Sequence, residues 1–226
     1  MTFFEMQLSF LLDFSDLGLA FVEVTSKLVD SKNLLCFIIC MKQILLTLLL
    51  LPNLSWALNS KHLLAAAAEN NIPHQITQNL IDYFSTHSAE IKNKNYVTFV
   101  DFSRPSSEDR MFIINTETGQ TEKFLVAHGK NSGDLYAEKF SNEENSKMSS
   151  LGYYLVEEKY RGEHGSSLKL SGLSSTNSKA RQRGIVMHPA DYVSDKWVSE
   201  QGRIGRSWGC FALNEDEFLR NAIDKI

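Results

Sequence analysis

Cysteine is scarce in this sequence, and no part of it is strongly basic. Three cysteines occur among 226 residues, and 43% of the residues are hydrophobic, so a core of ordinary size makes a disulfide framework unnecessary. The formal net charge is −4 and the pI is about 5.9, which argues against a nucleic-acid-binding protein because such proteins carry a basic stripe. No internal repeat is visible. One soluble catalytic domain with accessory segments is the expectation for this length.

Long hydrophobic runs are also lacking, but one short run has a recognisable context. Residues 41–57 read MKQILLTLLLLPNLSWA. Lys42 supplies a positive start, residues 44–51 form an apolar centre, and residues 55–57 form a small-x-small cleavage site. These three parts stand in the order of a secretory signal peptide.

A membrane anchor formed by residues 34–51 is the alternative interpretation of this run. It is disfavoured because Lys42 would lie in the middle of the span, where a charge is costly, and because the purely apolar run is too short to cross a bilayer. We therefore expect residues 1–40 to be an upstream extension with a misplaced start, and Met41 to be the true first residue. The mature protein is then expected to begin near Leu58, outside the cytoplasm, without stable membrane insertion.

Cleavage at this point would leave Cys210 as the only cysteine. A lone thiol in an oxidising compartment has no intramolecular disulfide partner, and such a thiol is a candidate for reactivity. The alternative is a buried, inert cysteine.

Helices are expected first and strands afterwards. The first helix covers about residues 60–70, and the second follows Pro73, with apolar residues at helical spacing. Runs rich in β-branched and aromatic residues then predict strands at 96–102, 111–115, 122–129, 152–160, 167–172 and 184–188. A capping sequence that begins at Asn214 predicts a short helix to Ile226. The sequence thus divides into a helical segment at 58–92 and a mainly β domain at 93–226.

The last third of the chain combines a histidine at the end of a strand with a cysteine that follows a glycine. Cys210 comes 22 residues after His188. A thiol near its free pKa is only a few per cent thiolate at pH 7, and an imidazole beside it can remove the proton. Gly209 would let a substrate carbonyl approach the backbone, so that amides around Gly209 and Cys210 are candidate oxyanion donors.

The residues just before Gly209 admit two interpretations each. Arg206 would either lower the pKa of the thiol and bind a substrate carboxylate, or form a surface ion pair. Ser207 and Trp208 would orient the substrate, although Trp208 would equally suit a core. His164, in a glycine-flanked loop, would line the pocket or structure the loop. A zinc site is improbable because no pair of candidate ligands has short spacing.

Several segments, in order along residues 95–215, resemble the L,D-transpeptidase catalytic (YkuD-like) family, in particular its branch with the GRSWGC motif. The matching segments are Phe140–Asn142, Ser149–Gly152, His164–Leu168, Leu170–Leu173, Ala180–Arg181, Arg183, Ile185–His188 and Gly202–Cys210. The resemblance implies a β-sandwich with Cys210 as nucleophile and His188 as base, the latter oriented by the backbone carbonyl of Pro189. One departure is Phe211, which stands where this branch usually has proline.

By the same resemblance, the substrates would be peptidoglycan stem peptides, with no cofactor and no metal. The reaction would join the third residues of two stems through a thioester on Cys210. An L,D-carboxypeptidase, in which water resolves the thioester, is one alternative, and a non-catalytic wall-binding module is another. Papain-like endopeptidases fit less well because their cysteine precedes the histidine, and sortases because their arginine follows the cysteine.

Overall fold

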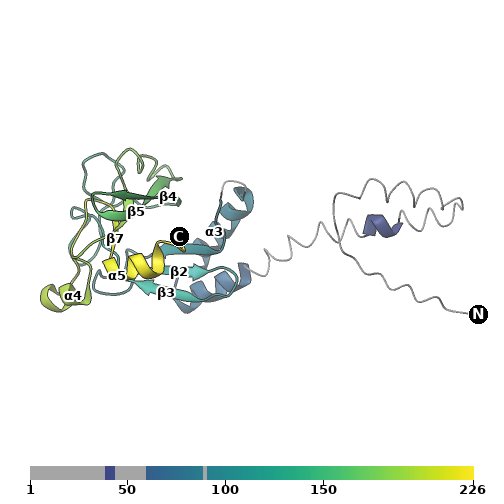
Figure 1. The fold of residues 1–226 in the computed structure, drawn as a ribbon, viewed down its shortest axis with the longest axis horizontal. Helices are drawn as coiled ribbons and strands as arrows, with labels where there is room; N and C mark the ends of the chain where they lie inside the picture. The colour runs from purple at the N-terminus through teal and green to yellow at the C-terminus, as the bar shows by residue number, and fades with distance from the viewer. Residues whose placement is uncertain (1–38, 44–59, 89–90) are drawn as a thin grey trace, which may run out of the picture. The chain divides into compact units, whose positions relative to one another are not determined.

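A computed structural model describes residues 39–43, 60–88 and 91–226. The chain divides into two units, residues 1–55 and residues 56–226. Within the first unit the description is limited to a helical stretch at 39–43 (Figure 1). The expected upstream extension and signal peptide therefore lie almost entirely outside the described residues. Among those that are described, no helix has the length and apolar character needed to cross a membrane.

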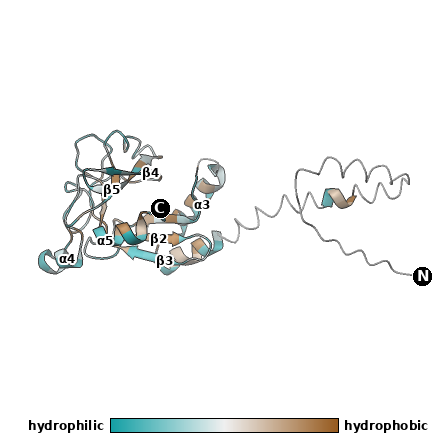
Figure 2. Cartoon of the chain, in the orientation of Figure 1, coloured by the Kyte–Doolittle hydropathy of each residue, from teal (hydrophilic) through white to brown (hydrophobic). Residues whose placement is uncertain are grey.

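The second unit opens with two helices that share one apolar cluster with a sheet. Residues 60–69 are helical, and α3 (His74–Thr86) begins directly after Pro73, as the sequence predicts. Both helices carry apolar and polar residues (Figure 2), which is the pattern of a helix with one buried face. The apolar side chains include Leu63, Ala67 and Ile81, which pack with residues of the first two strands.

Three antiparallel strands form the first sheet: β1 (Tyr96–Val100), β2 (Met111–Asn115) and β3 (Thr121–Phe124), in that order. The central strand β2 is buried on both faces. Because successive side chains of a strand point to opposite sides, Phe112 and Ile114 pack with the helices, whereas Met111 and Ile113 pack into the interior between the sheets.

Four strands form the second sheet, in the order β4 (Tyr154–Gly162), β5 (Gly165–Gly172), β6 (Val186–Pro189) and β7 (Phe211–Leu213). The first three are antiparallel neighbours, but β6 and β7 are parallel. A parallel pair needs a crossover, and here the crossover contains α4 (Asp195–Gln201). Neither α4 nor β7 is anticipated by the sequence patterns.

The strand expected at 122–129 is only half correct. Its regular pairing ends at Phe124, and the chain then leaves the first sheet for the second. There, Ala127 forms an isolated bridge with Ala212 and Gly129 forms one with Ser207. Residues 125–128 are buried along this path. Phe124 and Val126 pack into the core between the sheets, whereas Leu125 and Ala127 pack into a second apolar cluster. The apolar character that predicted a longer strand therefore reflects burial on both sides of this segment.

The main core lies between the two sheets and is completed by the end of the chain. Asn214 accepts hydrogen bonds from two backbone N–H groups of α5 (Glu215–Glu217), as the capping sequence predicts. The helix continues as the π-helical turn η2 (Phe218–Ala222), whose Phe218 packs with residues of both sheets. The mainly β sandwich predicted from the sequence is confirmed.

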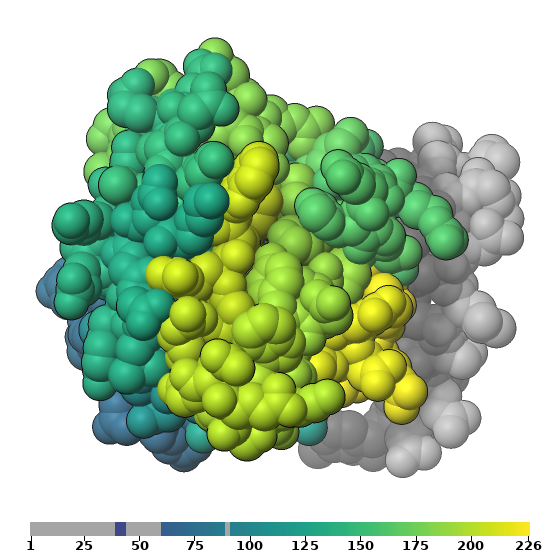
Figure 3. Space-filling model, turned by 90° about the vertical axis from the view of Figure 1, so that its left-hand side faces the viewer, coloured from purple at the N-terminus to yellow at the C-terminus, as the bar shows by residue number. Residues whose placement is uncertain are grey.

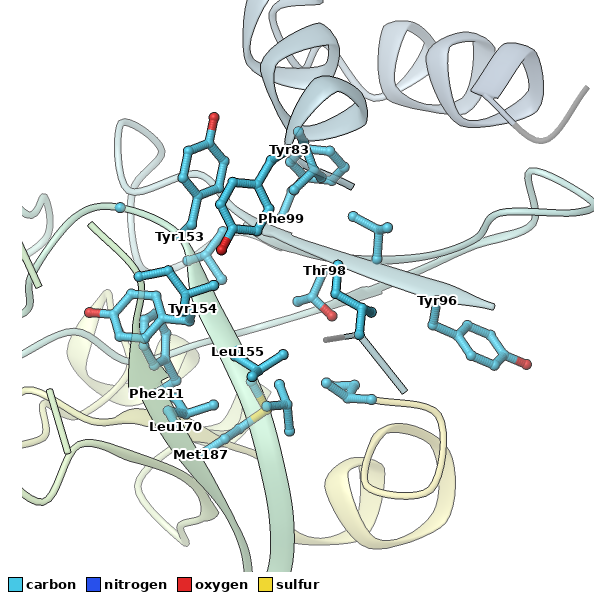
Figure 4. Close-up of a pocket in the computed structure, with 18 of the residues that line it drawn as sticks. Tyr83, Tyr96, Thr98, Phe99, Tyr153, Tyr154, Leu155, Leu170, Met187 and Phe211 are labelled. Carbon is cyan, nitrogen blue, oxygen red and sulfur yellow. The ribbon is translucent and has the colours of Figure 1, made fainter. Parts of the chain in front are cut away.

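A cavity of about 740 Å³ opens where β1 and β4, each at the edge of its sheet, face one another. Figure 4 shows that aromatic side chains from several elements surround it. Tyr83 of α3 stacks on Tyr153 with ring centroids 5.5 Å apart. Tyr154 meets Phe211 edge to face. The cavity thus extends to the residue that directly follows Cys210.

Candidate active site

The two candidate catalytic residues lie at the two parallel strands of the second sheet: His188 is within β6, and Cys210 directly precedes β7. His188 on β6 is the register partner of Ala212 on β7, and Cys210 lies two residues before Ala212. The parallel pairing of β6 with β7 thereby brings His188 near the turn that carries Cys210, although the two residues are 22 positions apart in sequence.

His188 is held in its neutral form. Its Nδ1–H donates to the backbone carbonyl of Pro189 at 2.9 Å, which leaves the lone pair on Nε2. The side chain is buried, and this burial lowers the pKa of His188; the nearby His164 lowers it further, against the opposing effect of the Pro189 hydrogen bond. A neutral imidazole with a free Nε2 can accept a proton at pH 7.

His164 lies on the turn between β4 and β5 and covers the base. Its ring stacks on that of His188 with centroids 4.3 Å apart and planes 23° from parallel. Both rings line a small pocket of about 260 Å³ that also includes Asp191, Tyr192 and Glu215. The sequence leaves two roles open for His164, lining the pocket or structuring the loop. In the structure, His164 lines this pocket.

Cys210 is half-buried, and its thiol does not contact His188 in this structure. The Sγ instead donates a weak hydrogen bond to the carbonyl of Gly184 at 3.6 Å. Burial raises the pKa of Cys210, while the backbone N–H of Val186 and the charge of Arg183 act in the opposite direction. The resting residue is therefore a thiol, which needs a base before it can act as a nucleophile.

Gly209 occupies a backbone conformation that requires glycine. Its φ is +123°, and an added Cβ would lie 2.7 Å from the carbonyl oxygen of Met148. The Gly209 N–H is occupied, because it donates to the Ser207 Oγ at 3.1 Å. The N–H of Cys210 has no partner among the described residues. Of the two amides that the sequence suggests as oxyanion donors, Cys210 is thus the one left free.

Ser207 and Arg206 hold the turn that carries Cys210. Ser207 is buried, and its hydroxyl donates to the carbonyl of Cys210 at 2.7 Å. Arg206 pairs with Asp134 at 3.1 Å and donates to the carbonyl of Gly133 at 2.8 Å. The sequence leaves two roles open for Arg206, an ion pair or direct binding of substrate. The structure shows the ion pair.

Trp208 is exposed to solvent, whereas its neighbour Ser207 is buried. Its side chain is 66% exposed, which excludes the core role considered for it. The ammonium groups of Lys130 and Lys147 lie 5.6 and 4.2 Å from its ring centroid. Figure 3 shows a narrow strip of yellow atoms, from near the end of the chain, reaching the surface between teal and green segments from its middle.

Arg183 is a residue of the site that the chemical patterns in the sequence do not single out. It donates to the carbonyls of Ser141 and Met148 and to the hydroxyls of Ser146 and Ser150. One of its terminal nitrogens lies 3.2 Å from the position that a Cβ on Gly209 would occupy. Arg183 therefore joins loop 141–150 to the cysteine turn. Its only sequence signal is its place in the family pattern.

A second buried histidine lies outside this site. His128 is fully buried, and its Nδ1 accepts a hydrogen bond from the Arg110 guanidinium at 2.7 Å. Burial and the charge of Arg110 lower the pKa of His128 to about 4. Within the described ranges, no group of three or more His, Cys, Asp and Glu side chains is arranged to hold a metal ion. His128 is thus a structural residue.

A cysteine just before one strand and a neutral histidine on the paired strand are residue types that serve as nucleophile and base in cysteine enzymes. The family described as the L,D-transpeptidase catalytic domain matches residues 68–226, and the chain belongs to this family. This confirms the family that the sequence indicates, while its branch with the GRSWGC motif stays a prediction. Searches of curated proteins and of solved structures return no match.

Proposed function

We propose that the protein is a peptidoglycan L,D-transpeptidase that works through a thioester on Cys210, with His188 as its base. The observation that carries this proposal is that Cys210 directly precedes β7, the parallel neighbour of the strand that carries His188, and that Nδ1 of His188 is fixed by Pro189. Membership in the family supports the reaction class and the peptidoglycan substrate. The roles of the individual residues follow from their chemistry.

The first half-reaction begins with rotation of the Cys210 side chain from the Gly184 carbonyl toward His188. Nε2 of His188 takes the thiol proton, and the thiolate attacks the carbonyl carbon of the third residue of a tetrapeptide stem, in the amide bond that joins this residue to the terminal D-alanine. The free N–H of Cys210 donates to the oxyanion. The C–N bond then breaks, His188 returns the proton to the departing D-alanine amine, and a thioester remains on Cys210.

The second half-reaction resolves the thioester. An amine of a second stem attacks the thioester carbon, its proton passes to His188, and the C–S bond breaks as the new amide forms. The product is a cross-link between third residues. If water attacks instead, the same residues give an L,D-carboxypeptidase. The acceptor amine would enter the pocket of about 260 Å³ beside His188, lined in part by Asp191, Tyr192 and Glu215. Because water can enter the same pocket, the reaction product distinguishes the two enzymes.

The test is incubation of the purified protein with disaccharide tetrapeptides, followed by mass analysis of enzyme and products. Dimers that have lost one D-alanine would support transpeptidation, whereas tripeptides alone would identify the carboxypeptidase. The Cys210→Ala variant should fold and form neither product. A variant with wild-type turnover would show that Cys210 is not the nucleophile.

A non-catalytic wall-binding module is separated from both enzymes by the reactivity of the thiol. In an enzyme, alkylation of Cys210 by iodoacetamide depends on His188, so that His188→Gln slows it. In a binding module the rate would be that of an ordinary thiol of the same exposure, whatever residue stands at 188.

We also propose that the protein acts outside the cytoplasm, in the periplasm or cell envelope. The support is the three-part signal sequence at 41–57. Mass spectrometry of the exported protein should find an N-terminus near Leu58. An exported protein that begins at Met1 would contradict both the start site and the cleavage site.

A further inference from the structure

We propose that Lys130 and Lys147, held against the exposed ring of Trp208, bind a carboxylate of the donor stem peptide. This inference rests on the proposed function and names the part of the site that would recognise the donor. It is carried by the position of the three residues next to Cys210, by the absence of counter-charges on the two lysines, and by the backbone of the loop that presents Lys147.

The position of Trp208 relative to Cys210 indicates which substrate it meets. Along the chain toward β7, Trp208 lies two residues before Cys210, and Ala212 lies two residues after it. Ala212 is the register partner of His188. The departing D-alanine amine of the donor and the acceptor amine both exchange a proton with His188, so both amines lie at that end. The acyl part of the donor stem then extends toward the opposite end, where Trp208 lies.

The two lysines carry charge that the protein does not neutralise. Neither Lys130 nor Lys147 forms an ion pair with a carboxylate of the described residues, whereas Arg203 and Arg206 both pair with Asp134. Two ammonium groups lie within about 6 Å of one indole ring, close to its negatively polarised face. Such a pair attracts an anion, and a carboxylate is the anion that stem peptides carry.

Local backbone conformation holds Lys147 in place. Its φ is +54° and that of Asn145 is +57°, which places two residues with side chains in a region that glycine favours. The carbonyl of Lys147 accepts a hydrogen bond from the N–H of Asn131 at 3.1 Å. A Cβ on Gly129 would lie 2.5 Å from that same carbonyl. The loop is therefore closely fitted, and it directs a long cationic side chain over Trp208.

Trp208 supplies the second half of the recognition. An indole that is 66% exposed beside a nucleophile gives a flat apolar surface against which the body of a peptide can lie. The two lysines, whose ammonium groups lie over the same ring, would then bind the carboxylate of that peptide. This arrangement separates orientation of the donor from the chemistry, which Cys210 and His188 perform.

The experiment measures the rate at which tetrapeptide stems acylate Cys210, followed by intact-protein mass, for the wild type and for Lys130→Gln, Lys147→Gln and the double variant. Lys123→Gln, an exposed lysine on β3, is the matched control. We expect kcat/KM to fall about threefold for each single variant and about tenfold for the double variant. The loss should lie mainly in KM, and added salt should reduce the difference.

Stems amidated at one carboxylate at a time identify the group that is bound. The stem that lacks the recognised carboxylate should react equally with the wild type and the double variant, within about twofold, and Lys→Arg replacements should retain the preference. Unchanged circular dichroism and unchanged iodoacetamide labelling of Cys210 would show that the variants are intact.

One outcome would overturn the lysine site alone, and another would overturn the proposed function as well. If the wild type acylates and the double variant matches Lys123→Gln with every stem, the lysine site is wrong and the proposed function stands. If the wild type forms no acyl-enzyme with any tetrapeptide, the proposed function fails and the donor site fails with it.

Discussion

Replacing Gly209 by alanine should damage both stability and catalysis, because the backbone at this position leaves no room for a methyl group. The φ of +123° lies outside the region that side chains tolerate, and the new Cβ would lie 2.7 Å from the Met148 carbonyl oxygen and 3.0 Å from Cδ1 of Ile185. Relief requires either the cysteine turn or loop 141–150 to move.

The magnitude can be bounded from two contributions. The unfavourable backbone conformation costs about 1–3 kcal/mol, and forcing atoms into a filled space costs roughly another 1–3 kcal/mol. Gly202, at the end of α4, is the matched control, because its φ is +73° and nothing lies within 4 Å of an added Cβ. Gly202→Ala should therefore cost only about 1 kcal/mol.

Urea unfolding of the two variants measures this difference, and iodoacetamide labelling of Cys210 follows the local geometry. Gly209→Ala should be less stable than Gly202→Ala by about 1–5 kcal/mol, and its acylation by tetrapeptide should fall by more than a hundredfold. Equal stability of the two variants, or normal acylation by Gly209→Ala, would refute the close approach of Met148 to the cysteine turn.

Three further perturbations test the electrostatics. The pKa of His128 is lowered to about 4 in the folded protein, so the unfolded chain, in which a histidine titrates near 6.5, takes up its proton at a higher pH. The free energy of unfolding therefore falls as the pH drops from 6.5 to 4, by about 3 kcal/mol in all. His128→Gln, which can still accept from Arg110, should flatten this part of a urea-unfolding series against pH, and an unchanged slope would contradict it. Arg183→Gln should raise the pKa of Cys210 further and move the pH profile of iodoacetamide labelling upward; a profile that stays in place would show that Arg183 does not act on the thiol. His188→Gln should reduce turnover by about 10²–10⁴-fold, and turnover within tenfold of the wild type would rule out His188 as the base.

Most strands were predictable because their patterns are local. The sequence of β2 is apolar at successive positions because both of its faces are buried, and the periodicity of α3 reflects its single buried face. The elements that escaped prediction are short: β7 has three residues and α4 has seven. An element of that length carries too few residues for a period to stand out.

The residues of the candidate site also differ in how far the local sequence identifies them. Cys210 and His188 could be identified from chemistry, because a lone thiol after a glycine and a histidine at a strand end are unusual on their own. The role of Arg183 could not be identified in that way, since its partners lie 33 to 42 residues away in the sequence. The same limit applies to Arg206, whose ion pair with Asp134 depends on how loop 129–150 folds.

The parallel pairing of β6 with β7 has a consequence for the length of the chain between base and nucleophile. His188 and its register partner Ala212, two residues after Cys210, are held one inter-strand spacing of about 4.8 Å apart, whereas the connection between the two strands travels outward through α4 and returns. Residues can be added to or removed from the exposed end of that crossover, near Gly202, without changing the distance across which the proton moves. A search for related enzymes should therefore allow this interval to vary, and a domain or affinity tag inserted there should leave the chemistry intact.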